Sequence, residues 1–476
     1  MTKKTRRLIF YIFLVLFIFV ALVIVFYALG YTFDWQKKSL TTTGAFYFKS
    51  HPDGAKIYIN NEYAGDTNKF IRRLTPKNYD IKISKSDYYD WQKTLDIKSG
   101  LVTEAENIFL IKNNYIANSV TDANVGDFFF SPDGTEVIYV AEKPVAKTTI
   151  LTLRLMNLTD NTDVQIYPLL IPSISSGFTQ ILPGLKNLAG IVWSNDKNKI
   201  LLSFSDNSYY VVFLRNEIKI INLQSLIQYS SNYTISSVKN PLIHPQDSNK
   251  IYFYFSSGLY FVKLNESEPY ESIVSLPMVS NVSSYTIFNN EILYIQSSKA
   301  ELYKTNFDGS SFKKVFDIPL LKPNESATII NDKLIIINKI LYLFEPKLQI
   351  FKKIVDGVKD FHFSNNEDKF LWITDNEIGI IWLKPDFEQP MRQEYDMESI
   401  IKIPQKINQA IWYSKSNQHI IYATDNEINI VELDNREKRN AAKIFSVENP
   451  EIFYNKQNNK LYILSKEKFL EITISD

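Results

Sequence analysis

Residues 113–476 repeat one pattern of short alternating strands, and this repetition limits the folds open to the chain more than any other feature. Each unit reads as a strand, a polar turn, a second strand, a tight turn and a third strand, as in "IVWSNDKNKILLSFSDNSYYVVFL" and "AIWYSKSNQHIIYATDNEINIVEL". A strand unit of this size cannot bury its apolar face alone, so neighbouring units must stack. The first strands begin near residues 128, 191, 242, 285, 327, 361, 410 and 451.

This spacing is typical of β-propeller blades, each of which is a sheet of four short strands. The units predict eight blades, with seven as the alternative if the unit at 327–358 is irregular. The last unit ends at its third strand. Residues 115–125 are therefore expected to supply its fourth strand, which would join the two ends of the ring and protect the edge strands.

An uncharged run from Leu8 to Leu29 follows the basic segment "MTKKTRR". A helix of this run is roughly 33 Å long at about 1.5 Å per residue, enough to cross a hydrocarbon core of about 30 Å. Because basic flanks stay in the cytoplasm, we expect a cytoplasmic tail at 1–7 and a transmembrane helix at 8–29. The chain would then be a single-pass protein of the cell membrane, with its C-terminal bulk outside the cytoplasm. A cleaved signal peptide ending at Gly30 is the alternative, but its apolar core of about 7–15 residues is usually shorter.

A second, smaller β-module is predicted at 44–112, after a linker at 30–43. The segments "GAFYFKS", "AKIYIN" and "NYDIKIS" alternate as strands do. Pro52-Asp53-Gly54 fits a turn, and Asn60-Asn61 fits a two-residue hairpin turn because Asn tolerates the left-handed region. About six short strands in about 70 residues predict a small antiparallel sandwich or barrel.

The stretch "GAFYFKSHPDGAKIYINNEYAGDT", with the later strand "YDIKI", resembles the PEGA domain, a small envelope-associated β-module named for its Pro-Glu-Gly-Ala turn. In this sequence Asp53 replaces the Glu of that turn, no Pro follows Thr67, and Asn78 stands where a Gly often precedes the Tyr. The resemblance implies a spacer or binding module on a membrane-anchored or extracytoplasmic bacterial protein. It supplies no catalytic residues.

The phrase "FFFSPDGTEVIYV" resembles the repeat of TolB-like and WD40-like propellers, whose blades carry a Ser-Pro-Asp-Gly turn. Residues 131–134 match this turn in full, and Ser194, Ser364 and Ser414 hold the Ser position in degraded copies. This resemblance concerns the fold, which by itself licenses no function. The expected fold class is therefore all-β apart from one N-terminal transmembrane helix, with a PEGA-like sandwich followed by a propeller.

Three turns between second and third strands carry acidic residues: "SDNS" at 205–208 and "TDNE" at 374–377 and 424–427. Equivalent turns of a propeller lie on one face, where they would form an acidic arc for a hard cation such as calcium. A local interpretation is favoured, because Asp-Asn is a good hairpin dipeptide. The candidate metal ligands are Asp206, Asp375, Glu377, Asp425 and Glu427.

Composition excludes several kinds of chemistry. The chain has no Cys and four His, which are far apart in sequence, so disulfides, thiolate catalysis and Cys-ligated zinc are ruled out. A net charge of +1 with interspersed signs gives no basic face for nucleic acid. The sequence contains no nucleophile elbow, phosphate loop or zinc-protease motif, and we expect no cofactor.

We therefore predict a membrane-anchored envelope protein that is not an enzyme and that acts as a binding or scaffold module. Its partner would be a protein, a peptide or a cell-envelope polysaccharide. Two alternatives stay open: a hydrolase or lyase with its site in the central channel of the propeller, and a signalling role. A tail at 1–7 is too short for a signalling domain, so signalling would act through another membrane protein.

Overall fold

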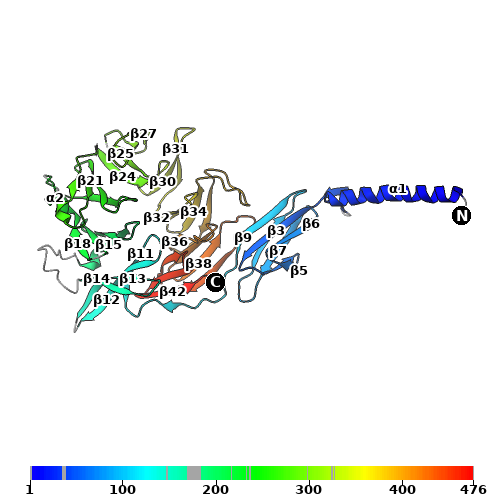
Figure 1. Ribbon diagram of the computed structural model, residues 1–476, viewed down its shortest axis with the longest axis horizontal. Coiled ribbons are helices and arrows are strands. Elements are labelled where there is room, and N and C mark those ends of the chain that lie inside the picture. Colours follow the sequence, from blue (N-terminus) through cyan, green and yellow to red (C-terminus); the bar gives the residue numbers. More distant parts are fainter. Residues whose placement is uncertain are drawn as a thin grey trace.

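Three parts follow one another along the molecule: a helix, a small β-module and a ring of sheets. Figure 1 shows the computed structural model, with helix α1 at one end, the small module next to it and the ring beyond. Residues 1–2 of the expected tail and 35–38 of the expected linker lie outside the described part. The described residues are 3–34, 39–145, 148–168, 184–215, 217–231, 233–234, 237–296, 298–322, 325 and 327–474.

Helix α1 (Lys3–Ala28) is long and apolar enough to cross a membrane, and none of its described residues is buried. It begins within the expected tail, because a helix continues readily through the polar residues that precede the apolar run. A hairpin of β1 (Tyr31–Asp34) and β2 (Ser39–Thr42) follows in the expected linker.

The small module contains two sheets, with the strand orders β6-β3-β9 and β5-β4-β7-β8. The prediction of about six antiparallel strands was wrong in one respect, because β3 and β9 pair in parallel. Alternation along a strand does not reveal which distant strand it will pair with. The seven strands are β3 (Gly44–His51), β4 (Lys56–Ile59), β5 (Glu62–Asp66), β6 (Lys69–Leu74), β7 (Asn78–Ser84), β8 (Trp91–Asp96) and β9 (Val102–Phe109).

The core of the small module lies between these two sheets. Phe46, Ile57, Ile83 and Trp91 are at most 3% exposed and belong to one apolar cluster. The predicted hairpin turn at 60–61 is confirmed, since both Asn residues have positive φ and join β4 to β5.

Beyond this module, the described residues form eight consecutive sheets, which we number 1 to 8. Sheets 1 to 4 contain β11 (Val125–Phe130), β12 (Glu136–Val145), β13 (Thr148–Asn157) and β14 (Asp163–Tyr167); β15 (Leu188–Trp193), β16 (Lys199–Phe204), β17 (Tyr209–Phe213) and β18 (Lys219–Asn222); β19 (Lys239–Ile243), β20 (Lys250–Phe255), β21 (Gly258–Lys263), β22 (Ile273–Val274) and β23 (Val279–Ser280); and β24 (Val282–Phe288), β25 (Glu291–Gln296), β26 (Glu301–Thr305) and β27 (Lys313–Asp317).

Sheet 5, which lies in the unit that the sequence left open as irregular, is a complete four-stranded sheet. Sheets 5 to 8 contain β28 (Ala327–Ile329), β29 (Leu334–Ile337), β30 (Ile340–Glu345) and β31 (Ile350–Val355); β32 (Asp360–Phe363), β33 (Lys369–Ile373), β34 (Glu377–Trp382) and β35 (Met397–Lys402); β36 (Ile407–Trp412), β37 (His419–Thr424), β38 (Glu427–Glu432) and β39 (Ala441–Ser446); and β40 (Glu451–Asn455), β41 (Lys460–Ser465), β42 (Lys468–Thr473) and β10 (Asn118–Ser119).

The ring closes as the sequence predicted, because β10 pairs with β42 and completes sheet 8. Each sheet shares a buried apolar cluster with the next, and sheet 8 shares one with sheet 1. The first strands of neighbouring sheets contact each other at β24 and β28, at β32 and β36, and at β36 and β40, so these strands lie innermost. Several second and third strands are buried on both faces; all six residues of β37, for example, are buried.

A short second helix, α2 (Leu223–Tyr229), lies between sheets 2 and 3 and was not predicted by the strand repeat. The Asn222 side chain caps it by accepting a hydrogen bond from the Ser225 N–H at 2.9 Å. Leu223, Leu226 and Ile227 pack into the cluster between the two sheets. Two short turns of 3-10 helix, at Leu185–Asn187 and Pro269–Glu271, complete the described helices.

Candidate functional site

The contact between the small module and the propeller is centred on a buried lysine, Lys93 of β8. Its side chain has no exposed area, and its Nζ lies 2.8 Å from Glu432 Oε1 at the end of β38. The ammonium also donates to the backbone carbonyls of Asp434, Arg436 and Lys438, at 3.0, 2.9 and 2.7 Å. A lysine has three N–H donors, and this cradle offers protein acceptors for all of them.

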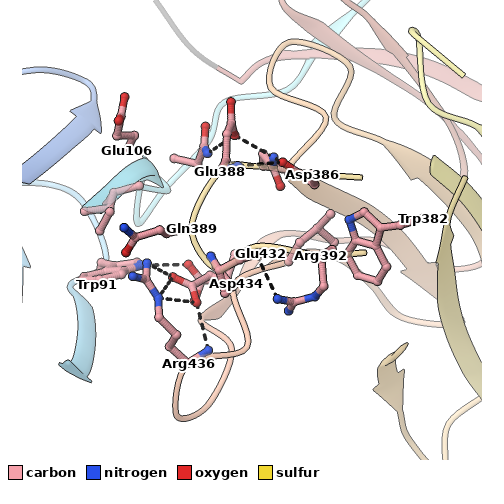
Figure 2. Close-up of a pocket in the computed structure, with 16 residues that line it drawn as sticks. Trp91, Glu106, Trp382, Asp386, Glu388, Gln389, Arg392, Glu432, Asp434 and Arg436 are labelled. Atoms are coloured by element: carbon pink, nitrogen blue, oxygen red, sulfur yellow. Dashed lines mark hydrogen bonds and ion pairs between the residues drawn. The ribbon is translucent and has the colours of Figure 1, made fainter. Parts of the chain in front are cut away.

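The partner carboxylate is satisfied equally well. Glu432 Oε2 accepts from the Trp91 indole N–H at 2.7 Å, and Oε1 accepts from the backbone N–H and the side-chain amide of Asn440 at 2.7 and 2.9 Å. Figure 2 shows Trp91 and Glu432 side by side at this contact. The cost of burying an ion pair is offset only when its remaining hydrogen-bonding groups are also satisfied. Because all these partners must be in place at once, the contact fixes one relative position of the small module and the propeller.

Side chains of the propeller also cover two open strand edges of the small module. Gln389 donates to the Val102 carbonyl at 3.0 Å and accepts from the Glu104 N–H at 3.1 Å, along the free edge of β9. Asn440 pairs in the same way with both backbone groups of Gln92 on β8, at 3.3 and 3.2 Å. At these residues each amide group takes the place of a neighbouring strand, which blunts both edges as templates for another chain.

All these contacts come from one face of the propeller. They involve the connection 433–440 of sheet 7 and the connection 383–396 of sheet 6, both between third and fourth strands. In an antiparallel sheet these connections lie at the same end as the turns between first and second strands. One such turn contributes Tyr413, whose ring centroid lies 4.7 Å from that of Phe109 on β9. The small module therefore covers this face, and the opposite face carries the starts of the first strands.

A cavity of about 520 Å³ opens among those strand starts, in the central channel. We call it the channel mouth. The rings of Phe130 and Phe453 stack within it, with centroids 3.9 Å apart. Its lining comes from the first strands of sheets 1, 6, 7 and 8 and includes Phe128, Phe130, Asp360, Asn408, Glu451 and Phe453.

Two carboxylates that line the channel mouth, Asp360 and Glu451, and a third beside it, Asp127, have perturbed acidities. Burial raises the pKa of Asp127, although the Phe128 N–H donates to its Oδ1 at 2.8 Å. Desolvation and repulsion from Asp127 raise the pKa of Glu451. Burial acts to raise the pKa of Asp360, but the contact with His362 outweighs it and the pKa is lowered; His362 Nε2 lies 3.1 Å from Asp360 Oδ2. Perturbed carboxylates in a concave site mark a candidate functional site.

A register pattern in the sequence marks this site. The first strands at 127–130, 360–363 and 451–454 each place an acidic residue before three largely apolar ones, in "DFFF", "DFHF" and "EIFY". An acid at one register of an otherwise apolar inner strand points into the channel of a propeller.

The five candidate metal ligands lie in three turns, and each has a polar or charged partner of its own. Asp206 accepts from the N–H and hydroxyl of Ser208 at 2.9 and 2.6 Å, as a hairpin turn requires. Within the described ranges, no group of three or more His, Cys, Asp or Glu is placed to hold a metal ion. Calcium binding, which the sequence made the less favoured interpretation, stays untested. The other partners are Lys359 for Asp375, Lys402 for Glu377, Asn408 for Asp425 and Asn429 for Glu427.

The Ser-Pro-Asp-Gly turn has a structural role, as expected. Ser131 is 2% exposed; its hydroxyl donates to Asp133 at 2.8 Å and accepts from the Glu136 N–H at 3.0 Å. Ser194 and Ser364 make the same pair of contacts in sheets 2 and 6. The repeated serine therefore ties the first strand to the second.

Comparison with known families places a PEGA domain at residues 43–109. The chain thus contains a PEGA domain followed by a β-propeller. No curated protein sequence matches this chain.

Solved structures similar to this chain are propellers. The Dos1 propeller is 11% identical, with a TM-score of 0.46 over 76% of this chain and 95% of its own. Sqt1 from Chaetomium thermophilum, solved with the N-terminus of a ribosomal protein, is 8% identical, with a TM-score of 0.45 over 76% of this chain and 98% of its own. The C-terminal WD40 domain of Sif2 is 12% identical, with a TM-score of 0.38 over 82% of this chain and 94% of its own.

Replacing Lys93 with Met should loosen the contact between module and propeller by about 3–5 kcal/mol, because Glu432 is left as a buried charge without its cation. Hydrogen exchange of the β8 amides in the full chain measures this opening. Lys98→Met, whose side chain is 72% exposed, should change it by less than about 0.5 kcal/mol. The double variant K93M/E432Q should recover part of the loss, and no recovery would contradict the role given to the ion pair.

Asp127→Asn should raise the melting temperature at pH 7 by about 1–3 °C, because it removes a carboxylate that burial keeps from ionising freely. The folded pKa is raised, so ionisation weakens the native state above the unfolded value of about 3.9, and the gap should close as pH falls to 4. Asp206→Asn is the matched control, because its expected change in stability has the opposite sign. Hydrogen bonds from Ser208 lower the pKa of Asp206, so this variant should lose stability at pH 7. Equal behaviour of the two variants would rule out the assigned causes.

Proposed function

We propose that this protein is an anchored binding module that presents the channel mouth of its propeller to a protein or peptide outside the cytoplasm. The observation that carries this proposal is the one-sided contact between the two parts. The small module covers the face with the 383–396 and 433–440 connections, and the channel mouth opens on the other face. Helix α1 precedes the small module, so a membrane at α1 would leave the channel mouth free.

A protein or peptide suits this face better than a polysaccharide. Glycan sites commonly offer exposed aromatic platforms, but the five described Trp side chains are only 2–8% exposed. The channel mouth instead combines stacked phenylalanines with carboxylates and amides, a mixture that fits apolar and hydrogen-bonding groups of a peptide. A cell-envelope polysaccharide is the less supported alternative.

An enzyme is the second candidate, and one observation favours it. Asp360 and His362 pair on β32, and Asp360 lines the same channel mouth as Glu451, whose pKa is raised. A proton donor and acceptor of this kind would serve a hydrolase or lyase. A partner recovered intact from both the wild-type protein and Asp360→Asn would support binding alone. Cleavage by the wild-type protein that Asp360→Asn abolishes would support the enzyme.

The membrane orientation is testable with single cysteines, because the chain contains none of its own. A membrane-impermeant maleimide added to intact cells should label Lys313→Cys on the propeller and leave Lys4→Cys unlabelled until the cells are lysed. Both variants should run at full length, since we propose that the anchor is not cleaved. Labelling of Lys4→Cys in intact cells would reverse the orientation, and its loss from the mature protein would show cleavage.

The binding face is testable by photo-crosslinking in cells. A photoreactive residue at Lys406 or at Asn408, both on the channel-mouth face, should capture the same partner. The control position is Lys352 in β31, an exposed residue on an outer strand, which should capture little. Equal capture at all three positions, or capture at Lys352 alone, would contradict the proposed face.

A further inference from the structure

A second cavity, of about 500 Å³, lies beside the contact between the small module and the propeller. Strand β9, the 383–396 connection of sheet 6 and the first turns of sheets 6 and 7 form its walls. Its volume is within the range of ligand pockets in proteins, about 300–1,000 Å³. It opens on the face opposite the channel mouth, so it is separate from the binding face proposed above.

Negative charge dominates this cavity. Its two lysines are already paired, Lys369 with Asp386 at 2.9 Å and Lys384 with Asp368 at 2.5 Å. Three further carboxylates have no cation among the described ion pairs, although the protein as a whole is nearly neutral. These are Glu104, Glu106 and Glu388.

The polar contacts of Glu388 leave its charge uncompensated. Its Oε2 accepts from the side-chain amides of Asn107 and Gln418 at 2.8 and 2.9 Å, and both donors are neutral. These contacts hold the carboxylate in place at the wall formed with β9. Because Glu106 lines the same cavity, a cation placed here would face two negative charges.

An unpartnered donor independently points to a ligand. Trp382 is 2% exposed and lines this cavity, yet its indole N–H has no acceptor in the described structure. In Figure 2 the nitrogen edge of this ring faces the other residues of the adjoining pocket. A buried N–H without an acceptor is unfavourable by about 1–3 kcal/mol, so it is expected to find one.

Three of the other four described indoles have acceptors. Trp91, Trp193 and Trp412 donate to Glu432, to the Phe129 carbonyl and to the His362 carbonyl. Trp372, also without an acceptor, packs over Gly379 on the neighbouring strand, away from the cavity lining.

The rim of the cavity supplies an apolar contact. Phe387 lines it and is 82% exposed. One ligand class carries all three complementary groups: a carbonyl acceptor for an indole N–H, a cation for the carboxylates and an apolar side chain for an exposed ring. That class is a peptide segment with a basic residue next to an apolar one.

We propose that this cavity binds a lysine- or arginine-bearing peptide segment of a partner protein. A backbone carbonyl of the segment accepts from the Trp382 indole, its ammonium or guanidinium lies between Glu106 and Glu388, and an apolar neighbour packs on Phe387. The protein then holds two partners at once, one at each face. A free polyamine shares the cationic chemistry but offers no acceptor to Trp382, so it is the contrasting ligand of the test.

The test titrates the full chain in nanodiscs with three probes: the fluorescent capped tripeptide Lys-Phe-Lys, the same peptide with Glu for both Lys, and spermidine. The Lys peptide should bind in a salt-sensitive manner, and the Glu peptide at least tenfold more weakly. Trp382→Phe, which removes the donor and keeps the ring, should weaken the Lys peptide by roughly three- to tenfold. Glu106→Gln and Glu388→Gln should do the same. Glu62→Gln, an exposed carboxylate elsewhere on the small module, should have no effect.

Several results would overturn the proposal. One is the absence of saturable binding of the Lys peptide below about 1 mM. Another is equal binding of the Glu peptide. Spermidine that competes fully and is insensitive to Trp382→Phe would assign the cavity to a free polyamine. If the Trp382→Phe variant does not fold, Glu106→Gln serves as the test, because this exposed side chain supports no packing. An unchanged affinity of Glu106→Gln for the Lys peptide would then refute the site. Crosslinking at Lys406 and Asn408 tests the channel mouth separately.

Discussion

The ammonium of Lys93 has no exposed area, and the placement of the propeller depends on it. A buried charge accepts only the arrangement that satisfies it. Its partners are the Glu432 carboxylate, the more distant Asp434 carboxylate at 4.0 Å and three carbonyls, at the end of β38 and in the connection that follows. Sliding or tilting the small module would leave both Lys93 and Glu432 buried without a partner. The ion pair therefore selects one relative position of the two parts, whether or not an apolar pair at the same place would give the same stability. Which propeller face points away from α1 follows from this pair.

Open strand edges impose a second constraint, and the chain meets it in two ways. Within the propeller, β10 completes sheet 8 and the ring leaves its innermost strands in mutual contact. In the small module, β8 and β9 end their sheets, and the amides of Asn440 and Gln389 occupy their free backbone groups. The same loops thus provide both the ion pair and the edge cover. This coupling explains why the small module contacts loops of sheets 6 and 7 and not the outer strands.

The features that depend on residues close together in the sequence could be predicted. The repeat at 113–476, the turn at 60–61 and the closing segment before sheet 1 follow from alternation, turn chemistry and an incomplete last unit. The parallel pairing of β3 with β9 did not follow, because the two strands lie at opposite ends of the small module and each reads as an ordinary alternating strand. Lys93 reads as one polar position of a strand, and nothing near it in sequence reveals that Glu432 is its partner. The acids near the channel mouth are visible as a register pattern, whereas the acidic turns make structural contacts: Asp206 accepts within its own hairpin, and Asp425 accepts from Asn408 on the first strand of its sheet.

Desolvated carboxylates at the channel mouth work against stability, and this is why they matter for function. Asp127 and Glu451 stand near the starts of two inner strands; burial raises the pKa of both, and repulsion from Asp127 raises that of Glu451 further. A chain under selection for folding alone gains nothing from this arrangement, since local conflicts of this kind concentrate at functional sites. The unpaired indole of Trp382 and the uncompensated Glu106 and Glu388 are the same kind of conflict on the opposite face. Two unsatisfied sites on two faces, held in fixed relation by one ion pair, are what a module that bridges partners requires.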